Sequence, residues 1–514
     1  MKLPARLGLA LLAGGAAVFG MAPFDCWPVL ILSLGVLAWL IDTTADRPRP
    51  KREAALTGWA FGFAYFAGGF YWVGEAFYVD PATIWMMPFA VTLLPAGMAI
   101  YYGLAAFAAR AFPLRGPAFA ALLAASFGAF EFLRGWLFTG FPWNLFGSTF
   151  IGSGIDQGAA LAGIYGLTLA TMLLGFGLAP LITARGFTRA VTASLGLFLL
   201  AAGAFYGVWR GPAPPATTTM LRIVQPDNPQ SEKGLPDYSR RLWLRLMGLT
   251  NADGAENIDF FVWPEGVTPF FLDETPEALA VIGDNLTPGQ VLIAGSSRRQ
   301  KLKDGTRYYN SLFVVDDTGT IATVYDKAHL VPFGEYLPFP EAFRALDIAS
   351  LTARIGGAFT AGPGLQTLNA GVIPAFSPLI CYEALFSAEV VGTGQHRPQW
   401  LVNITDDSWF GTQTGPWQHL TAARFRAIEE GLPLIRAATT GVSAVIDSDG
   451  HVVIASGLAE AIKLDAALPG ARPPTLFSQA GNLIFWLLLG GALALTGLLS
   501  FTERAFSVKG LGKV

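Results

Sequence analysis

Three predicted strands each end on a residue that could take part in catalysis: Glu265, Lys327 and Cys381. Strand ends are rigid, so side chains on them can converge on one site. A thiol is a weak nucleophile while protonated and needs a base, which Glu265 could supply. Lys327 could stabilise the oxyanion of a tetrahedral intermediate and help to hold the thiolate. The three residue types together therefore indicate nucleophilic catalysis through Cys381.

Each of these residues also has an ordinary structural explanation. A lone cysteine in an apolar strand is usually a small buried hydrophobe. The glutamate follows Trp263 and Pro264, a context typical of a turn, and a lysine at a strand end is usually solvated. The combination of base, amine and thiol at three strand ends is what favours catalysis.

The elements that would position these residues form an alternating pattern. Helix-like spacing of apolar residues alternates with short apolar runs, which predicts a layered α/β domain. Helices are expected at 236–250, 276–286 and 420–431. Strands are expected at 221–225, 259–263, 291–297, 310–316, 320–326, 375–383, 400–405 and 443–449.

The composition of the whole chain excludes several classes of protein. Of its 514 residues, 53% are hydrophobic and 14% are charged, whereas soluble proteins are about 25% charged. Disorder, a coiled coil and a disulfide scaffold are excluded, and two cysteines make no disulfide framework. The net charge of −3 gives no basic field for nucleic acid.

Apolar residues are unevenly distributed and divide the chain. We expect a membrane domain over 1–210, a soluble domain over 218–470, one further span within 476–502, and a tail over 503–514. A membrane span needs about 20 mostly apolar residues. About eight spans are expected, near 7–24, 27–41, 54–74, 84–109, 117–134, 157–183, 190–209 and 480–501.

The charges of the loops predict the orientation. Basic residues precede the first span and recur in every second loop, and basic loops stay cytoplasmic. Both termini are then cytoplasmic, and the soluble domain lies outside, in the periplasm of a two-membrane bacterium. The basic residues are Lys2, Arg6, Arg47, Arg49, Lys51, Arg52, Arg110, Arg115, Arg185, Arg189, Arg504, Lys509 and Lys513, and the alternate loops hold Asp25, Glu75, Asp80 and Asp156.

The stretch 135–155 is apolar but rich in glycine, proline and aromatic residues. This composition predicts a re-entrant or interfacial segment rather than a regular span. Trp136, Phe141 and Trp143 suit the headgroup layer. A simple aromatic belt and a lipid-handling role both remain open for it.

Three blocks around the candidate residues resemble the signature blocks of the nitrilase superfamily. They are WPEG at 263–266, YDKAHLVPFGEYLP at 325–338 and LICYEALF at 379–386. The flanking sequence resembles one membrane branch, the apolipoprotein N-acyltransferase family, through HLVPFGEYLPF, NITDDSWFGTQTGPWQHL (403–420) and GFPWN (140–144). The order of spans, soluble domain and final span is also similar, so the resemblance covers essentially the whole chain.

The resemblance implies a polytopic α-helical membrane domain joined to a nitrilase-like α-β-β-α sandwich with a catalytic Glu265, Lys327 and Cys381 triad. It implies supporting roles for Glu335, which matches the family's second glutamate, and for Asn310 near the site. Tyr382 and Glu383 match the two residues after the nucleophile. The backbone N–H of Tyr382 is also placed as an oxyanion donor.

The reaction that the resemblance implies is acyl transfer in two halves. Cys381 takes an acyl chain from a phospholipid as a thioester, and the α-amine of a diacylglyceryl-cysteine lipoprotein then accepts it. The partners are therefore a phospholipid donor, a lipoprotein acceptor and the membrane, with no nucleic acid, and a monomer is expected. The expected location is the bacterial inner membrane, with the catalytic domain in the periplasm.

The sequence departs from the family pattern at two positions. Family members commonly have an apolar residue where Asn228 lies and tryptophan where Gly234 lies. The missing aromatic puts the contacts to acyl chain or peptide in doubt, and Trp409 or Trp417 could compensate.

Neither a cofactor nor a metal is expected. The four histidines, His329, His396, His419 and His451, lack metal-ligand spacing, and no glycine-rich phosphate loop occurs. Two rival functions stay open. A membrane-tethered nitrilase-type amidase would act without phospholipid, and a transporter with a ligand-binding outer domain would pair charges within its spans, with Glu131 and Arg134 as the main candidates.

Overall fold

The computed structural model describes residues 1–79, 81–233, 235–303, 305–338, 341, 359–392, 394 and 396–511. The chain forms two compact units. The first unit comprises Met1–Pro212, Gln413–Glu430 and Pro474–Val514, and the second comprises Ala213–Thr412 and Gly431–Pro473. Residues 413–430, which fall inside the soluble stretch expected from the sequence, therefore group with the helical unit.

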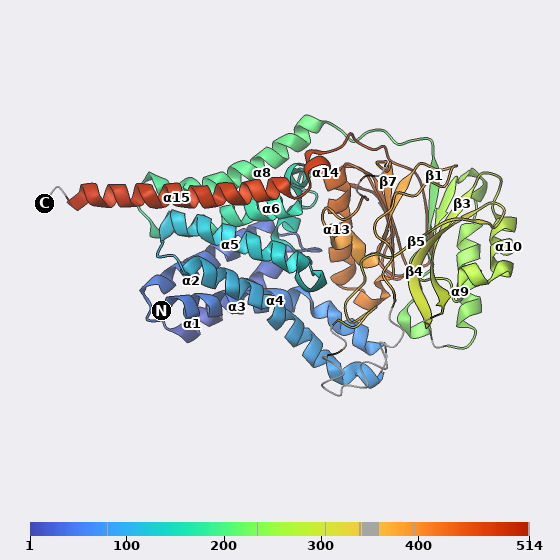
Figure 1. Cartoon of the computed structure of the whole chain (residues 1–514), viewed down its shortest axis with the longest axis horizontal. Coiled ribbons are helices and arrows are strands. Elements are labelled where there is room, and N and C mark those ends of the chain that lie inside the picture. Colours follow the sequence, from blue (N-terminus) through green and yellow to red (C-terminus); the bar gives the residue numbers. More distant parts are fainter. Residues whose placement is uncertain are drawn as a thin grey trace. The chain divides into compact units, whose positions relative to one another are not determined.

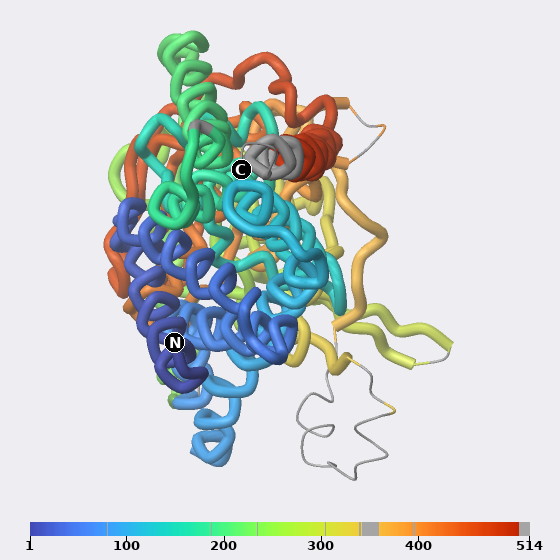
Figure 2. Tube along the Cα trace, turned by 90° about the vertical axis from the view of Figure 1, so that its left-hand side faces the viewer, coloured from blue at the N-terminus to red at the C-terminus, as the bar shows by residue number. Residues whose placement is uncertain are grey.

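The first unit is built from helices that run side by side (Figures 1 and 2). Five of them, α1 to α5, begin with a proline in the first turn, where the missing N–H has no helical partner to lose. The helices are α1 (Leu3–Ala17), α2 (Trp27–Asp42), α3 (Pro50–Gly69), α4 (Met87–Arg110), α5 (Gly116–Trp136), α6 (Ala159–Phe176), α7 (Leu178–Thr183), α8 (Val191–Arg210), α13 (Gly415–Glu430), α14 (Leu476–Ala480) and α15 (Leu483–Leu511).

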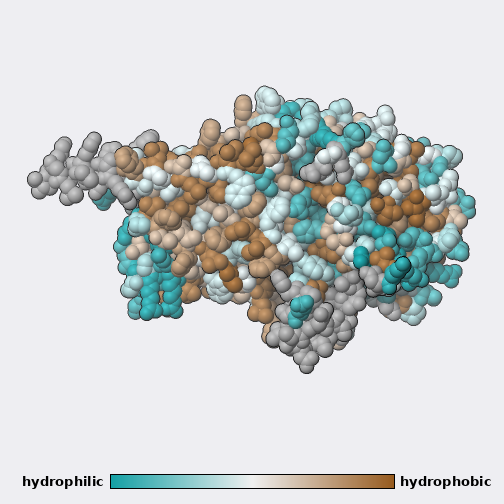
Figure 3. All heavy atoms as spheres, viewed as in Figure 1, coloured by the Kyte–Doolittle hydropathy of each residue, from teal (hydrophilic) through white to brown (hydrophobic). Residues whose placement is uncertain are grey.

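Seven helical segments in the described part of the chain are long and apolar enough to cross a membrane. The expected third span is also a helix, α3, but Lys51, Arg52 and Glu53 in its first turn leave it outside this set. Apolar side chains cover much of the helical unit's surface in Figure 3, and Leu12, Phe198, Leu487 and Leu498 are among those exposed. Such a surface suits contact with lipid chains.

The stretch after α5 is irregular, as its composition predicts. Phe138, Gly140 and Asn144 all have positive φ, at 57°, 80° and 53°. Arg134, fully buried with Glu131, donates to Glu131 Oε2 at 2.5 Å and to the Trp143 carbonyl at 3.0 Å. The pair of charges thus holds this irregular backbone, which gives both residues a structural task.

The second unit contains two β-sheets. The first has the order β11-β1-β2-β3-β4-β5, with β1, β2 and β3 parallel, and the second has the order β10-β9-β8-β7-β6, with β6, β7 and β8 parallel. The strands are β1 (Met220–Gln225), β2 (Phe260–Val262), β3 (Val291–Leu302), β4 (Gly305–Asp316), β5 (Ile321–Asp326), β6 (Phe376–Ile380), β7 (Trp400–Thr405), β8 (Leu434–Ala438), β9 (Ala444–Ile446), β10 (Val452–Ala455) and β11 (Ile462–Ala467).

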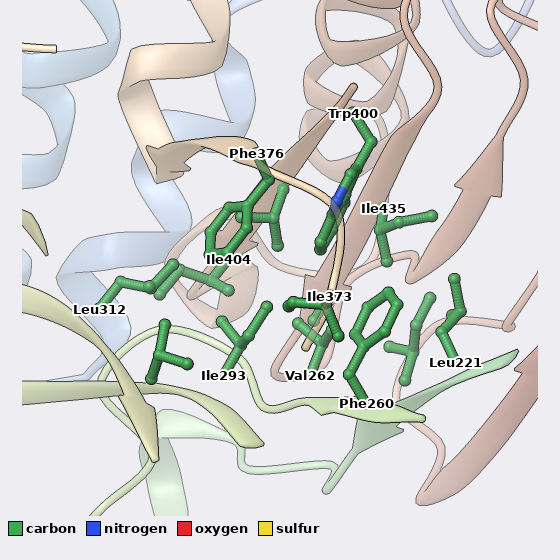
Figure 4. Packing of buried hydrophobic residues seen from close by; sticks show 14 of the residues in the cluster. Leu221, Phe260, Val262, Ile293, Leu312, Ile373, Phe376, Trp400, Ile404 and Ile435 are labelled. Carbon is green, nitrogen blue, oxygen red and sulfur yellow. The ribbon is translucent and has the colours of Figure 1, made fainter. Parts of the chain in front are cut away.

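The main core of this unit lies between the sheets (Figure 4). Phe260 and Ile293 of the first sheet pack there with Phe376, Trp400 and Ile404 of the second. Helices α9 (Tyr238–Thr250) and α10 (Pro276–Asn285) cover the other face of the first sheet through a second apolar cluster (Figure 1). The unit is therefore layered, with strand ends free to carry a site.

All eight expected strands are present, but some bounds differ and three strands were not predicted. The predicted strand 375–383 ends at Ile380, because the chain turns into a 3₁₀ helix over Cys381–Leu385. Strands β3 and β4 extend as a long hairpin through charged residues that the apolar pattern does not cover. The unpredicted strands are β8, β10 and β11.

Candidate active site

Glu265, Lys327 and Cys381 lie just beyond the ends of β2, β5 and β6, and all three are buried. The segment that follows β2 passes close to β3. A Cβ on Gly295 of β3 would lie 2.2 Å from the Pro264 carbonyl oxygen and 2.6 Å from Glu265 Cα. Glycine at 295 is thus required for the glutamate to reach its position.

Both carboxylate oxygens of Glu265 are held by hydrogen bonds. Oε1 accepts from Asn310 Nδ2 at 2.6 Å and from Lys327 Nζ at 3.3 Å. Oε2 accepts from the backbone N–H of Asp406 at 2.7 Å. Burial raises the pKa of Glu265, Lys327 opposes this rise, and the carboxylates of Glu335 and Asp406 add to it.

Lys327 lies between two carboxylates. Its Nζ is 2.9 Å from Glu335 Oε1 and 3.3 Å from Glu265 Oε1, and its side chain is 1% exposed. Burial alone would lower its pKa, but the two glutamates more than offset this and raise the pKa above that of a free lysine. The ammonium therefore stays charged throughout the physiological range.

Glu335 is fixed by its own loop and by Asn310. Its Oε2 accepts from the Val331 N–H at 2.8 Å, and its Oε1 accepts from Asn310 Nδ2 at 2.9 Å. One amide group therefore bridges two carboxylates. Asn310 lies on β4, and its carbonyl also accepts from the Lys327 N–H at 2.8 Å.

Cys381 opens the 3₁₀ turn after β6 with a φ of 50°, a left-handed conformation that is uncommon for a residue with a side chain. Burial raises the pKa of its thiol, and the carboxylate of Glu265 raises it further. Lys327 and the side chain of Thr405 act in the opposite direction. The resting thiol is protonated at neutral pH, so attack on a carbonyl needs a base at the moment of reaction.

Glu383 joins the end of β6 to the end of β5. Its Oε2 accepts from the Ile380 N–H at 2.7 Å, and its Oε1 accepts from Tyr325 Oη at 2.8 Å and from the Ala328 N–H at 2.7 Å. This carboxylate therefore fixes the segments that carry Cys381 and Lys327. Tyr382, between Cys381 and Glu383, packs its ring edge-on to Phe386 at 5.0 Å.

Two features next to the site were missed by the sequence reasoning. Asp406 contacts Glu265 through its backbone, and residue type gives no signal for such a role. Asp407, fully buried, pairs with Arg436 of β8 at 2.6 Å and accepts from Thr405 Oγ1 at 2.8 Å. The NITDDS stretch carried the signal, since two adjacent carboxylates follow a buried strand there.

The positions that depart from the family pattern have separate environments. Asn228 is buried and accepts from Tyr238 Oη at 2.9 Å, whereas Gly234 lies outside the described residues. Trp409 is 42% exposed, with Lys233 Nζ 5.8 Å from its ring centre. Trp417 belongs to α13 of the first unit.

The chain matches two protein families over separate stretches. Residues 13–177 match the apolipoprotein N-acyltransferase N-terminal domain, and residues 239–466 match carbon-nitrogen hydrolase. The apolipoprotein N-acyltransferase of Rhodopseudomonas palustris is 40% identical over 497 residues, which is 93% of this chain and 92% of the relative. The chain belongs to the apolipoprotein N-acyltransferase family.

Two other apolipoprotein N-acyltransferases are similar to this chain over most of its length. The Sinorhizobium fredii enzyme is 39% identical over 96% of both chains, and the Bradyrhizobium diazoefficiens enzyme is 41% identical over 93% of this chain and 92% of its own. A yeast structure, Nit3 of the nitrilase superfamily, aligns with a TM-score of 0.35 and 16% identity over 52% of this chain and 94% of its own.

Family membership confirms the resemblance, the fold class and the enzyme class inferred from the sequence. In this chain the stretch that matches the apolipoprotein N-acyltransferase N-terminal domain contains helices long and apolar enough to cross a membrane, and the carbon-nitrogen hydrolase match follows it. The protein is an acyltransferase of lipoprotein biosynthesis. The relatives are bacterial, and seven helices in the described part of the chain are long and apolar enough to cross a bilayer. The protein is therefore a bacterial membrane protein with a lipoprotein acceptor.

Proposed function

We propose that the protein moves a fatty acyl chain from a phospholipid to Cys381, and from there to the N-terminal α-amine of a diacylglyceryl-cysteine lipoprotein. One observation carries the proposal. The ammonium of Lys327 is held between Glu265 and Glu335, at 3.3 Å and 2.9 Å, beside a buried thiol in a strained turn. This arrangement supplies a base, an oxyanion partner and a nucleophile.

In the first half of the reaction Glu265 takes the proton from Cys381 Sγ, and the sulfur attacks the ester carbonyl of the phospholipid. Negative charge develops on the carbonyl oxygen, where Lys327 and the Tyr382 N–H stabilise it. The C–O bond then breaks, Glu265 returns the proton to the leaving oxygen, and a lysophospholipid departs. A thioester remains on Cys381.

In the second half the α-amine of the lipoprotein attacks the thioester carbonyl. Glu265 takes a proton from the amine, the C–S bond breaks, and the sulfur leaves with a proton restored to it. The product is an N-acylated, triacylated lipoprotein. Since water would also attack a thioester, burial of Cys381 at 8% exposure supports transfer over hydrolysis.

The same proposal includes the location. Both substrates are lipids anchored in the outer leaflet of the inner membrane, so the catalytic unit would act on the periplasmic side. The alternation of basic and acidic loops supports this orientation. We propose that the enzyme works there as a monomer.

The experiment that tests the proposal is mass spectrometry of the purified protein after incubation with phospholipid alone. A fatty-acyl adduct that hydroxylamine removes is expected on the Cys381 peptide. Cys26, the other cysteine of the chain, provides a matched control: Cys26→Ala should keep the adduct and Cys381→Ala should lose it. An amidase acting on small amides, or a transporter, would give no adduct from phospholipid.

A further inference from the structure

Beyond the triad, the two oxygens of Glu265 are held by different parts of the chain. Asn310 and Lys327 hold Oε1, whereas the backbone N–H of Asp406 donates to Oε2 at 2.7 Å. Asp406 follows β7 and starts a short 3₁₀ turn over Asp407–Phe410. The direction of its N–H, and hence of the base, depends on how firmly this turn is fixed.

The side chain of Asp406 fixes the turn from two sides. Its Oδ1 accepts from the Ser408 N–H at 3.2 Å and from Thr439 Oγ1 at 2.7 Å. Its Oδ2 accepts from Lys233 Nζ at 2.9 Å and from Gln230 Nε2 at 3.2 Å. The segment after β1 thereby clamps the residue whose amide holds the base.

We propose that Lys233 and Asp406 act as a positioning pair that orients Glu265 and balances the charge beside it. Neither side chain contacts the reacting atoms in this scheme, so both are positioning residues. The inference rests on the proposed function, because it takes Glu265 to be the base of the acyl transfer.

The charges around Glu265 determine the sign of the effect. The groups that face it are Lys327, Glu335, Cys381 and Asp406, with the neutral amide of Asn310. Asp406 is a negative neighbour that raises the pKa of Glu265. Lys233 offsets that charge, and its side chain is only 31% exposed and that of Asp406 only 13%, so solvent does not screen the pair completely.

Removal of one partner should therefore shift the pH dependence of acylation in a defined direction. Lys233→Met leaves the carboxylate of Asp406 uncompensated, which raises the pKa of Glu265. The acid limb, meaning the fall in the rate of Cys381 adduct formation at low pH, should therefore move to higher pH by about one unit. Asp406→Asn leaves an uncompensated ammonium and should lower the limb by a similar amount. The double variant removes a neutral pair and should return the limb toward its wild-type position.

The measurement uses the full-length protein with phospholipid as the acyl donor, and follows the adduct at Cys381 by mass over a pH series. Lys233→Arg keeps the charge and should restore the wild-type limb. Lys463→Met is the matched control, because it breaks another Lys–Asp pair of the same unit, with Asp465 at 2.7 Å on β11. It should leave the limb unchanged.

The outcomes separate this inference from the proposed function. If adducts form in every variant with the same acid limb, the positioning pair is overturned while the acyl transfer stands. If the wild type forms no adduct from phospholipid, the proposed function fails and this inference fails with it. Lys233 is partly exposed, so Lys233→Met carries the test even if Asp406→Asn loosens the turn.

Discussion

The Nδ2 group of Asn310 donates to Oε1 of Glu265 at 2.6 Å. The same amide also donates to Glu335 Oε1 at 2.9 Å, so it bridges the buried carboxylate of Glu265 and the partly buried carboxylate of Glu335 and orients both. Loss of a hydrogen bond to a buried charged group costs about 1.5–3 kcal/mol. Substitution of Asn310 should therefore impair the site by loosening Glu265, although Asn310 carries no reacting atom.

Asn310→Ala should slow the formation of the Cys381 adduct by about 10–100-fold, because Glu265, the proposed base, loses a hydrogen bond that orients it. Asn251→Ala is the matched control, because Asn251 makes an exposed amide contact with Asn285 at 2.7 Å. Adduct formation from phospholipid at fixed pH is the measurement. An Asn310→Ala protein as fast as the control would remove this bridge from the account of the site.

Lys327 should be essential for turnover but not for folding into the membrane. Lys327→Met removes the oxyanion partner and should reduce turnover by about 10²–10³-fold. Lys327→Arg should also fail, because a planar guanidinium does not replace a compact ammonium between two glutamates. The rate of triacylated product formation checks both, with membrane insertion measured in parallel. Near-normal turnover of Lys327→Met would exclude lysine from the mechanism.

The pKa of the Cys381 thiol should respond to its two charged neighbours in opposite directions. Burial and the Glu265 carboxylate raise this pKa, and Lys327 lowers it. In a Cys26→Ala background, Glu265→Gln should therefore speed alkylation by iodoacetamide below the thiol pKa, by up to about tenfold per unit of pKa lost. Lys327→Met should slow it.

The same Glu265→Gln change should slow acylation by phospholipid, which needs the base during the reaction. In Glu265→Gln the rate of alkylation should thus rise while the rate of acylation falls. If alkylation also slowed in Glu265→Gln, the carboxylate would be activating the resting thiol rather than raising its pKa.

The sequence predicted the strands that carry the site because apolar runs bounded by turn residues identify buried strands. It missed β8 because Arg436 interrupts the apolar run of that strand. The burial of Arg436 depends on its ion pair with Asp407, which lies on a different segment of the chain. It missed β10 and β11, the edge strands of the two sheets, which contribute few buried residues: none on β10 and Leu464 alone on β11. Such pairings depend on contacts that local patterns do not contain.

The candidate site can be divided in the same way into local and tertiary features. Glu265, Lys327 and Cys381 could be proposed from the sequence because their types are reactive and each follows a predicted strand, and they remain a prediction. Asp406 was missed because its backbone N–H is what contacts Glu265, and every residue type except proline carries that group. Gly295 was missed because its importance comes from the close approach of Pro264, a tertiary contact.

The predicted orientation has its own test. Basic loops alternate with acidic ones along the chain, which predicts cytoplasmic termini and a periplasmic catalytic unit. A reporter active only in the periplasm should be active when fused after Thr217, beyond α8. Fused after Gly186, between α7 and α8, it should be silent. Active Gly186 and silent Thr217 fusions would reverse the orientation.

The roles of Glu265 and Cys381 separate when the two halves of the reaction are followed independently. The thiol is needed in both halves, whereas the base takes a proton from sulfur in the first and from the amine in the second. Cys381→Ala should therefore give neither adduct nor product. Cys381→Ser should be nearly as poor, because a hydroxyl is much harder to deprotonate than a thiol.

Glu265→Gln keeps the shape of the side chain and removes the base. It should form the adduct very slowly, and any adduct that forms should persist after the lipoprotein acceptor is added. The measurement is the adduct at position 381 over time, with and without acceptor. Normal acylation and discharge would make Glu265 a structural turn residue after Trp263 and Pro264. Triacylated product from Cys381→Ala would mean that no covalent intermediate forms on this cysteine, and the proposed mechanism would fail at its first step.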